Sequence, residues 1–288
     1  MKKNRILALT GAACLSVALL AGCGSNNNTD PSANSADNGD ASALSGKVAT
    51  GGSTSMQKLC EAMIESFEES YPDITVTAEY TGSGAGLESL VGGKTDIGNA
   101  SRALKDGEKD SGAVENIVAI DGIAVITHTS NTVSDLTSQQ LTDIYTGKIT
   151  NWVDLGGADE AIVVLGREAG SGTRDGFESI VDVKDSCKYA QELTATGAVI
   201  SAVEANPLAI GYASLSAVDD TVAMVTVEGV ECSEATVKDG SYKIQRPFVF
   251  VTNKSVTLSE QAQAFMDFAA SKDAADLIRT AGAVPVNE

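Results

Sequence analysis

A run of hydrogen-bond donors lies in the segment VLGREAGSGTRDGF, residues 164–177, which has few large apolar side chains in its middle. Arg167 is followed at short spacing by Ser171, Thr173 and several glycines. An arginine fork suits two oxygens of an oxyanion, hydroxyls donate further hydrogen bonds, and glycine lets the backbone approach closely. The pattern fits either a flexible polar turn or a binding site for an anion.

Three further turns combine glycine with Ser, Thr or Arg: GGSTS at 51–55, TGSGAG at 81–86 and GNASR at 98–102. In an open α/β sheet, turns between a strand and a helix meet at the carboxyl ends of the strands. Helix N-termini there present free N–H groups and the positive end of the helix dipole. Helix capping alone explains any single turn of this kind. The four turns together predict a site for a small, multiply charged anion.

The segments between the turns carry alternating strand and helix patterns. Residues 47–80 show a strand, a glycine turn, a helix with apolar residues at helical spacing, and a second strand with alternating apolar residues. A capping box begins a helix at Thr137, and residues 259–282 predict one long helix or two short ones. Further strands are expected at 116–131, 161–168 and 246–253. These βαβ units predict an α/β fold with a mostly parallel sheet, and the length of 288 residues predicts two lobes.

The formal net charge is −19, and 43% of the residues are apolar. No basic patch of useful size forms on so acidic a surface, which argues against nucleic acid or an anionic membrane surface as a partner. Any anion must therefore be held by local donors rather than by the overall field.

Enzymatic motifs are missing from the sequence. The glycine run at Gly82 has Leu87 where a dinucleotide-binding fingerprint needs its third glycine, and no phosphate-binding loop of the G-x-x-x-x-G-K-[ST] type occurs. No serine lies in a G-x-S-x-G nucleophile elbow. The single histidine, His128, is better explained as a structural or surface residue. The sequence therefore predicts no catalytic residue, no metal site and no cofactor.

The N-terminus has the pattern of an export signal. Residues 1–22 combine a basic start with an apolar run too short to remain in a membrane, and LAGC then places Cys23 at its end. This resembles the lipobox of bacterial lipoproteins, which implies cleavage before Cys23 and attachment of a lipid to its thiol. An ordinary signal peptide with an incidental cysteine is the alternative. Residues 23–46 are rich in Ser, Asn, Asp and Gly, so we expect a flexible tether.

Besides Cys23, three cysteines remain in the expected mature chain, an odd number that excludes complete internal pairing. Cys60 lies on the apolar face of a predicted helix and is expected to be a small buried hydrophobe. Whether Cys187 and Cys232 pair stays open at this point.

In chain order, GGSTS, TGSGAG, TDIGNASR and REAGSGTR together resemble the phosphate-binding lipoproteins of bacterial phosphate ABC importers, and REAGSGTR is the most specific of the four. The resemblance runs from about Lys47 to the C-terminus. It implies a two-lobed periplasmic-binding-protein-like fold (type II) that closes over inorganic phosphate between its lobes. It also implies a receptor anchored to the cell membrane by its lipid, on the extracytoplasmic face, that delivers phosphate to a membrane permease.

The resemblance assigns residues 47–127 plus 247–288 to one lobe and 128–246 to the other, with hinge strands near 123–127 and 246–251. Many family members carry an aspartate in the third turn that accepts the proton of phosphate. Ser101 occupies that place here, and its hydroxyl can accept as well as donate. The phosphate-binding residues implied are Thr54, Ser55, Ser83, Ser101, Arg167, Ser171, Gly172 and Thr173.

Other functions stay open on the sequence alone. The same donors suit sulfate, molybdate or a phosphorylated small molecule, and a surface hydrolase of phosphate esters or an adhesin would come from other functional classes. Arg102 and Arg174 have no role assigned, since each can reach an anion or pair with an acidic neighbour such as Asp175.

Overall fold

A computed structural model describes residues 44–287 of the chain. The predicted signal at 1–22, Cys23 and most of the predicted tether lie outside the described residues. Of the residues expected in the tether, Leu44 packs against a core and Gly46 begins the first strand. Within residues 44–287, no helix combines the length and the hydrophobicity needed to cross a bilayer.

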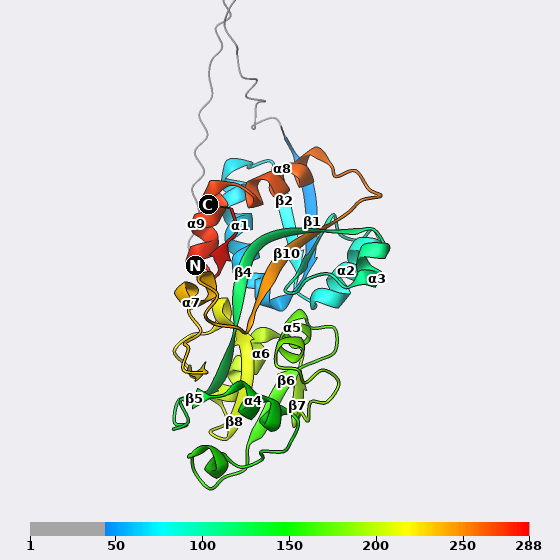
Figure 1. Ribbon diagram of the computed structural model, residues 1–288. Coiled ribbons are helices and arrows are strands. Elements are labelled where there is room, and N and C mark those ends of the chain that lie inside the picture. The colour runs from blue at the N-terminus through cyan, green and yellow to red at the C-terminus, as the bar shows by residue number, and fades with distance from the viewer. Residues whose placement is uncertain (1–43, 288) are drawn as a thin grey trace, which may run out of the picture. The chain divides into compact units, whose positions relative to one another are not determined.

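The elements alternate between strands and helices as the sequence predicts, so the α/β class is confirmed (Figure 1). The strands are β1 (Gly46–Gly52), β2 (Ile74–Glu79), β3 (Ile97–Ala100), β4 (Ala113–His128), β5 (Asp135–Leu136), β6 (Val163–Arg167), β7 (Gln191–Leu193), β8 (Ala209–Ser214), β9 (Val222–Val227), β10 (Gln245–Asn253) and β11 (Val284–Pro285). The α-helices are α1 (Gln57–Ser70), α2 (Ser83–Val91), α3 (Asp106–Asp110), α4 (Ser138–Tyr145), α5 (Gly172–Ile180), α6 (Thr196–Glu204), α7 (Glu234–Lys238), α8 (Glu260–Ala269) and α9 (Lys272–Thr280). Short 3-10 turns occur at Thr54–Met56, Trp152–Leu155 and Leu215–Ala217.

Local signals account for several helix ends. Thr137 and Gln140 form the expected capping box at the start of α4, and Gly147 adopts a positive φ just beyond its end. The C-terminal stretch at 259–282 forms two helices, because Ser271 caps a new helix by accepting the N–H of Ala274.

The sheet is mixed, which corrects the expectation of a mostly parallel one. Parallel pairing joins β1 to β2 and β3, and β6 to β7 and β8. The long strands β4 and β10 pair antiparallel with each other, and β4 also runs antiparallel to β8 and β9. Figure 1 shows β4 and β10 running side by side from the elements around β1 to those around β8.

Two large cores lie along these strands. The α1–α8 core contains Met63, Phe67 and Phe265 with parts of β1, β4 and β10, and it draws its buried residues from 48–119 and 248–283. The β4–β8 core draws its buried residues from 123–244, with Val284 added from β11. Strand β4 contributes Ala119 to the former and Ile123 to the latter, so it passes from one core to the other within a few residues.

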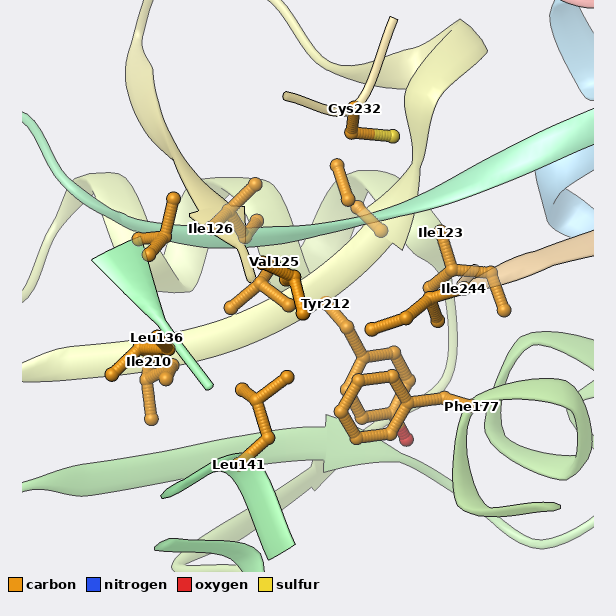
Figure 2. Packing of buried hydrophobic residues seen from close by; sticks show 14 of the residues in the cluster. Ile123, Val125, Ile126, Leu136, Leu141, Phe177, Ile210, Tyr212, Cys232 and Ile244 are labelled. Atoms are coloured by element: carbon orange, nitrogen blue, oxygen red, sulfur yellow. The ribbon is translucent and has the colours of Figure 1, made fainter. Parts of the chain in front are cut away.

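The β4–β8 core fixes the helix that carries the REAGSGTR turn. Figure 2 shows the ring of Phe177, from α5, against Tyr212 of β8. The ring centroids are 4.2 Å apart and nearly parallel. Because Phe177 is fully buried, this contact sets the position of the N-terminus of α5 relative to the sheet.

Candidate functional site

The first turn ends β1 and starts the helical segment that leads into α1. Ser53 caps that segment by accepting the N–H of Ser55 at 3.2 Å. Gly52 has a φ of 146°, and a Cβ there would collide with the carbonyl of Asn99 on β3. Glycine is therefore required where β1 passes β3, and the hydroxyls of Thr54 and Ser55 follow immediately in buried positions.

The second and third turns meet the first through hydroxyl contacts. Ser83 begins α2, and its Oγ accepts the backbone N–H of Ser101 at 3.2 Å. The hydroxyl of Ser53 donates to Ser101 Oγ at 2.8 Å. The three turns are therefore joined into one buried hydroxyl cluster at the ends of β1 and β3.

The fourth turn brings the N-terminus of α5 against this cluster. Ser171 caps α5 by accepting the N–H of Arg174 at 3.3 Å. Gly172 lies so close to the other turns that an added Cβ would collide with Ser83 Oγ and stand 2.7 Å from Ser101 Oγ. The next residue, Thr173, has its Oγ1 2.7 Å from Ser55 Oγ.

Arg167 lies at the end of β6 with 1% of its surface exposed. Its guanidinium donates to the carbonyls of Leu193 and Thr194 at 3.0 and 2.9 Å, and to Thr196 Oγ1 at 3.2 Å. No carboxylate of residues 44–287 forms an ion pair with it. Burial lowers the pKa of Arg167 to about 10, which still leaves the side chain charged at neutral pH. Two of its five N–H groups keep no partner within the described chain, so they are free to serve an anion.

Arg102 and Arg174, which lie near the site, are both neutralised. Arg102 pairs with Glu108 at 2.7 Å and with Asp175 at 2.8 Å. Arg174 pairs with Glu178 at 2.8 Å and Glu192 at 3.1 Å. Acidic neighbours thus pair with the guanidinium groups of both arginines. Arg167, in contrast, has no acidic partner among residues 44–287.

All the predicted binding residues are buried and belong to these four turns. One further residue, Thr196, was not predicted from the sequence; it begins α6 and is 2% exposed. Its Oγ1 lies 3.0 Å from both Thr54 Oγ1 and Ser55 Oγ, and it also accepts from Arg167. Like the four predicted turns, Thr196 lies between a strand and a helix, so its position was detectable in principle. The strand and helix patterns around it are weaker than those around the four turns.

Groups suited to other chemistry are not found at the site. Among residues 44–287, no cluster of His, Cys, Asp and Glu has the arrangement needed to hold a metal ion. His128 lies at the far end of β4, where its Nδ1 accepts the N–H of Ser130. Cys187 and Cys232 are both free thiols, as is Cys60, and burial raises the pKa of Cys187 to about 11. The arrangement is therefore one of hydroxyls, helix N-termini and one uncompensated guanidinium.

Comparison with known proteins identifies relatives that are named as phosphate-binding or phosphate-transport proteins. The PBP superfamily domain matches residues 31–273. A phosphate-binding protein PstS of Bacillus subtilis is 33% identical over 298 aligned positions, covering 100% of this chain and 96% of the relative. A crystal structure of a phosphate ABC transporter substrate-binding protein with bound phosphate, from Clostridium perfringens, is 44% identical with a TM-score of 0.82, covering 84% of this chain and 100% of that one. An ABC-type phosphate transport receptor from Vibrio cholerae is 30% identical with a TM-score of 0.70, covering 83% and 100%.

Proposed function

The chain belongs to the PBP superfamily and, within it, to the phosphate-binding PstS proteins, and from this premise we propose that it is an extracytoplasmic receptor for inorganic phosphate. It captures the anion and delivers it to the permease of an ABC importer. It performs no chemistry on its ligand, in keeping with relatives that are named as binding proteins of a transporter.

The main support for the proposal is that Arg167 is buried and has no carboxylate partner among residues 44–287. A buried cation without a carboxylate partner is costly, and proteins normally compensate it. Here the surrounding groups are carbonyls and the hydroxyl of Thr196. An oxyanion supplies the missing charge, and the hydroxyls of Ser55 and Thr173 supply donors for its other oxygens.

The close packing of the turns favours a small, complete anion over an ester. Ser55 and Thr173 touch across the site, and Gly172 lies against Ser83 and Ser101. An organic group attached to phosphate has no exit through these contacts, which argues against a phosphate-ester hydrolase. Sulfate stays the relevant competitor, because Ser101 offers a hydroxyl where a carboxylate would reject a fully deprotonated anion.

We place the ligand between two lobes, formed by residues 47–127 plus 247–288 and by residues 128–246. The two large cores support this division, since β4 contributes to both and β10, which contributes to the α1–α8 core, begins directly after Ile244 of the β4–β8 core. The change of core between Ala119 and Ile123 favours a crossing a few residues before 127. Closure then proceeds by bending of these two strands, and the donors of both lobes surround the anion only in the closed form.

The N-terminal pattern adds the cellular setting to the proposal. Cleavage before Cys23 and lipid attachment to its thiol anchor the receptor to the outer face of the cell membrane, with residues 23 to about 43 as a tether. Mass spectrometry of the protein from its membrane tests this: a diacylglycerol-modified Cys23 is expected at the N-terminus, and an unmodified one contradicts the anchor.

Calorimetric titration tests the receptor itself. The protein, stripped of bound anion in mild denaturant and refolded, is titrated with phosphate and then with sulfate between about pH 5 and pH 8. Tight phosphate binding with little response to sulfate is expected. Comparable affinity for sulfate would indicate a general oxyanion receptor. If neither anion binds, the four turns serve only as helix caps.

A further inference from the structure

A buried ion pair, distinct from the predicted binding residues, lies where β4 and β10 cross from one core to the other. Asp121 and Arg246 are direct neighbours in the antiparallel register of these strands. Arg246 donates to Asp121 Oδ2 from Nε at 3.2 Å and from Nη2 at 3.0 Å. Their exposed fractions are 0% and 3%. Because burying two charges costs more than burying two apolar side chains, such a pair calls for a reason beyond joining two strands.

The free end of the Arg246 fork reaches the candidate site. Its Nη1 donates to the backbone carbonyl of Ser101 at 3.0 Å. The side chain also lies along α5, since a Cβ added to Gly176 would stand 3.5 Å from Arg246 Cδ. Arg246 therefore touches both the Ser101 turn and the helix that carries Thr173.

Asp121 is held from its other side by two serines, Ser214 at the end of β8 and Ser216 just beyond it. The hydroxyl of Ser214 donates to both carboxylate oxygens, at 2.8 and 2.9 Å, and the backbone N–H of Ser216 also bonds to the carboxylate. Ser216 Oγ lies 2.7 Å from Ser214 Oγ and 3.5 Å from the carbonyl of Ser55. Since Ser216 has one hydroxyl proton, the longer contact to Ser55 is the weaker one. This network therefore contacts Ser101 through the hydrogen bond from Arg246, and it contacts Ser55 through the longer and weaker contact from Ser216.

The charges of this network cancel. Burial raises the pKa of Asp121 and lowers the pKa of Arg246, while their attraction opposes both changes. A neutral pair leaves Arg167 as the uncompensated cation nearby. Arg246 therefore acts on the site through the orientation of its guanidinium and not through its charge.

We propose that Asp121 and Arg246 are positioning residues for the oxyanion site: the carboxylate orients the guanidinium, and the guanidinium fixes the Ser101 turn. This inference rests on the proposed function. It fixes the backbone from which the Ser101 hydroxyl projects, and that hydroxyl occupies the place of the family's proton-accepting aspartate. A misplaced Ser101 weakens binding of a protonated anion more than that of sulfate, which has no proton to offer. The pair thus supports selectivity as well as affinity.

The test uses Arg246→Lys in the full-length protein, with phosphate affinity measured by calorimetry and sulfate affinity by competition. Lysine keeps the charge and can pair with Asp121, but it lacks the fork that holds Asp121 and the Ser101 carbonyl together. The phosphate Kd is expected to rise about tenfold, with a smaller change for sulfate. Leu141→Ala is the control, since Leu141 is buried in the β4–β8 core and belongs to α4, which contains none of the four turns. It should lower the melting temperature and leave both Kd values, and their ratio, as in the unsubstituted protein.

Ser214→Ala supplies an independent variant, because it removes only the hydroxyl that steadies Asp121. A rise of about threefold in the phosphate Kd is expected, and in combination with Arg246→Lys the two losses should be non-additive, as for groups in one network. A phosphate Kd within about twofold of the unsubstituted value in folded Arg246→Lys, or in Ser214→Ala if the lysine variant does not fold, overturns the inference. A proportional loss for phosphate and sulfate overturns the selectivity role. Failure of the unsubstituted protein to bind phosphate is a different result, and it contradicts the proposed function itself.

Discussion

Ser55 Oγ and Thr173 Oγ1 lie 2.7 Å apart, although 118 positions separate the two residues in the chain. Ser55 precedes α1, and Thr173 lies in the first turn of α5. Two helical segments therefore direct their N-termini toward one point. Free N–H groups and the positive ends of two dipoles converge there with the hydroxyls, which is the arrangement that stabilises an anion.

Replacing Arg167 by alanine should abolish this stabilisation. Its charge has no carboxylate partner among residues 44–287, so a bound anion relies on it directly. Loss of a desolvated charge contact costs about 3 kcal/mol or more, equivalent to at least about a hundredfold in the phosphate Kd. Calorimetry measures the change.

Arg174→Ala is the matched control for that experiment. Arg174 is already paired with Glu178 and Glu192, so its removal should change the phosphate Kd by less than about threefold. Equal losses in the two variants would contradict the different roles given to the two arginines.

Gly172→Ala should also prevent binding, for a steric reason. A Cβ at Gly172 would collide with Ser83 Oγ and stand 2.7 Å from Ser101 Oγ, so either these site hydroxyls or the N-terminus of α5 must be displaced. We expect the phosphate signal in calorimetry to disappear while the protein stays folded, as judged by circular dichroism.

Gly197→Ala offers a control in the same helical context. Gly197 lies in the first turn of α6 and has open space around the position of a Cβ. Alanine there should keep phosphate affinity and raise the free energy of unfolding by about 0.4–1 kcal/mol. Loss of binding in this variant would show that any change near the site is harmful, and the steric argument for Gly172 would fail.

Asp175 connects the two proposed lobes through charge. Its Oδ2 lies 2.8 Å from Arg102 Nε and 2.7 Å from Lys105 Nζ. The contact with Arg102 is poorly aligned as a hydrogen bond, so the attraction is mainly Coulombic. Asp175→Asn should raise the phosphate off-rate and weaken affinity by about 1 kcal/mol, roughly fivefold, since this attraction assists closure.

Salt provides the control for the Asp175 prediction. Screening shortens the Debye length from about 10 Å at 0.1 M to about 3 Å at 1 M, so the difference between Asp175→Asn and the unsubstituted protein should shrink in high salt. Stopped-flow measurements of phosphate release determine this difference at each salt concentration. A difference that stays constant with salt would argue for a steric effect of the substitution.

Much of this site was predictable from residue types and spacing. The turns containing Ser55, Ser83 and Arg167 each join a strand to a helix, and that local pattern is visible in the chain. The α/β class follows from the same alternation. Their convergence on one point was not visible in any single turn, and it was inferred from the rule that strand–helix turns meet at the carboxyl ends of the strands, with support from the family resemblance.

The residues that were missed depend on long-range geometry. Thr196 reaches Thr54 across 142 positions, and Asp121 faces Arg246 across 125. Both β4 and β10 read correctly as strands, but an apolar strand pattern does not encode the direction or register of its partner. For the same reason the sheet was expected to be mostly parallel, whereas its two longest strands are antiparallel.

Glu108 gives a prediction about pH, because it accepts hydrogen bonds from Arg102 at 2.7 and 2.8 Å and from the N–H of Lys105 at 2.8 Å. Burial raises the pKa of Glu108, but these bonds and the nearby positive charges outweigh burial and lower it. The ionised form is therefore favoured in the folded protein. Its stabilising contribution is complete above the unfolded-state pKa of glutamate, about 4.3, and is lost as the pH falls through the lowered folded value.

Urea unfolding of the unsubstituted protein and of Glu108→Gln, from about pH 7 down to pH 3, measures this contribution. The unsubstituted protein should be more stable by about 0.5–1 kcal/mol near neutrality, because the side chain is partly exposed, and the two should converge as the pH falls through the lowered folded-state pKa of Glu108. Asp276→Asn is the control, since Asp276 pairs with Arg279 with 85% of its side chain exposed and should matter little at any pH. A gap between Glu108→Gln and the unsubstituted protein that widens as the pH falls would mean that Arg102 does not stabilise the ionised carboxylate.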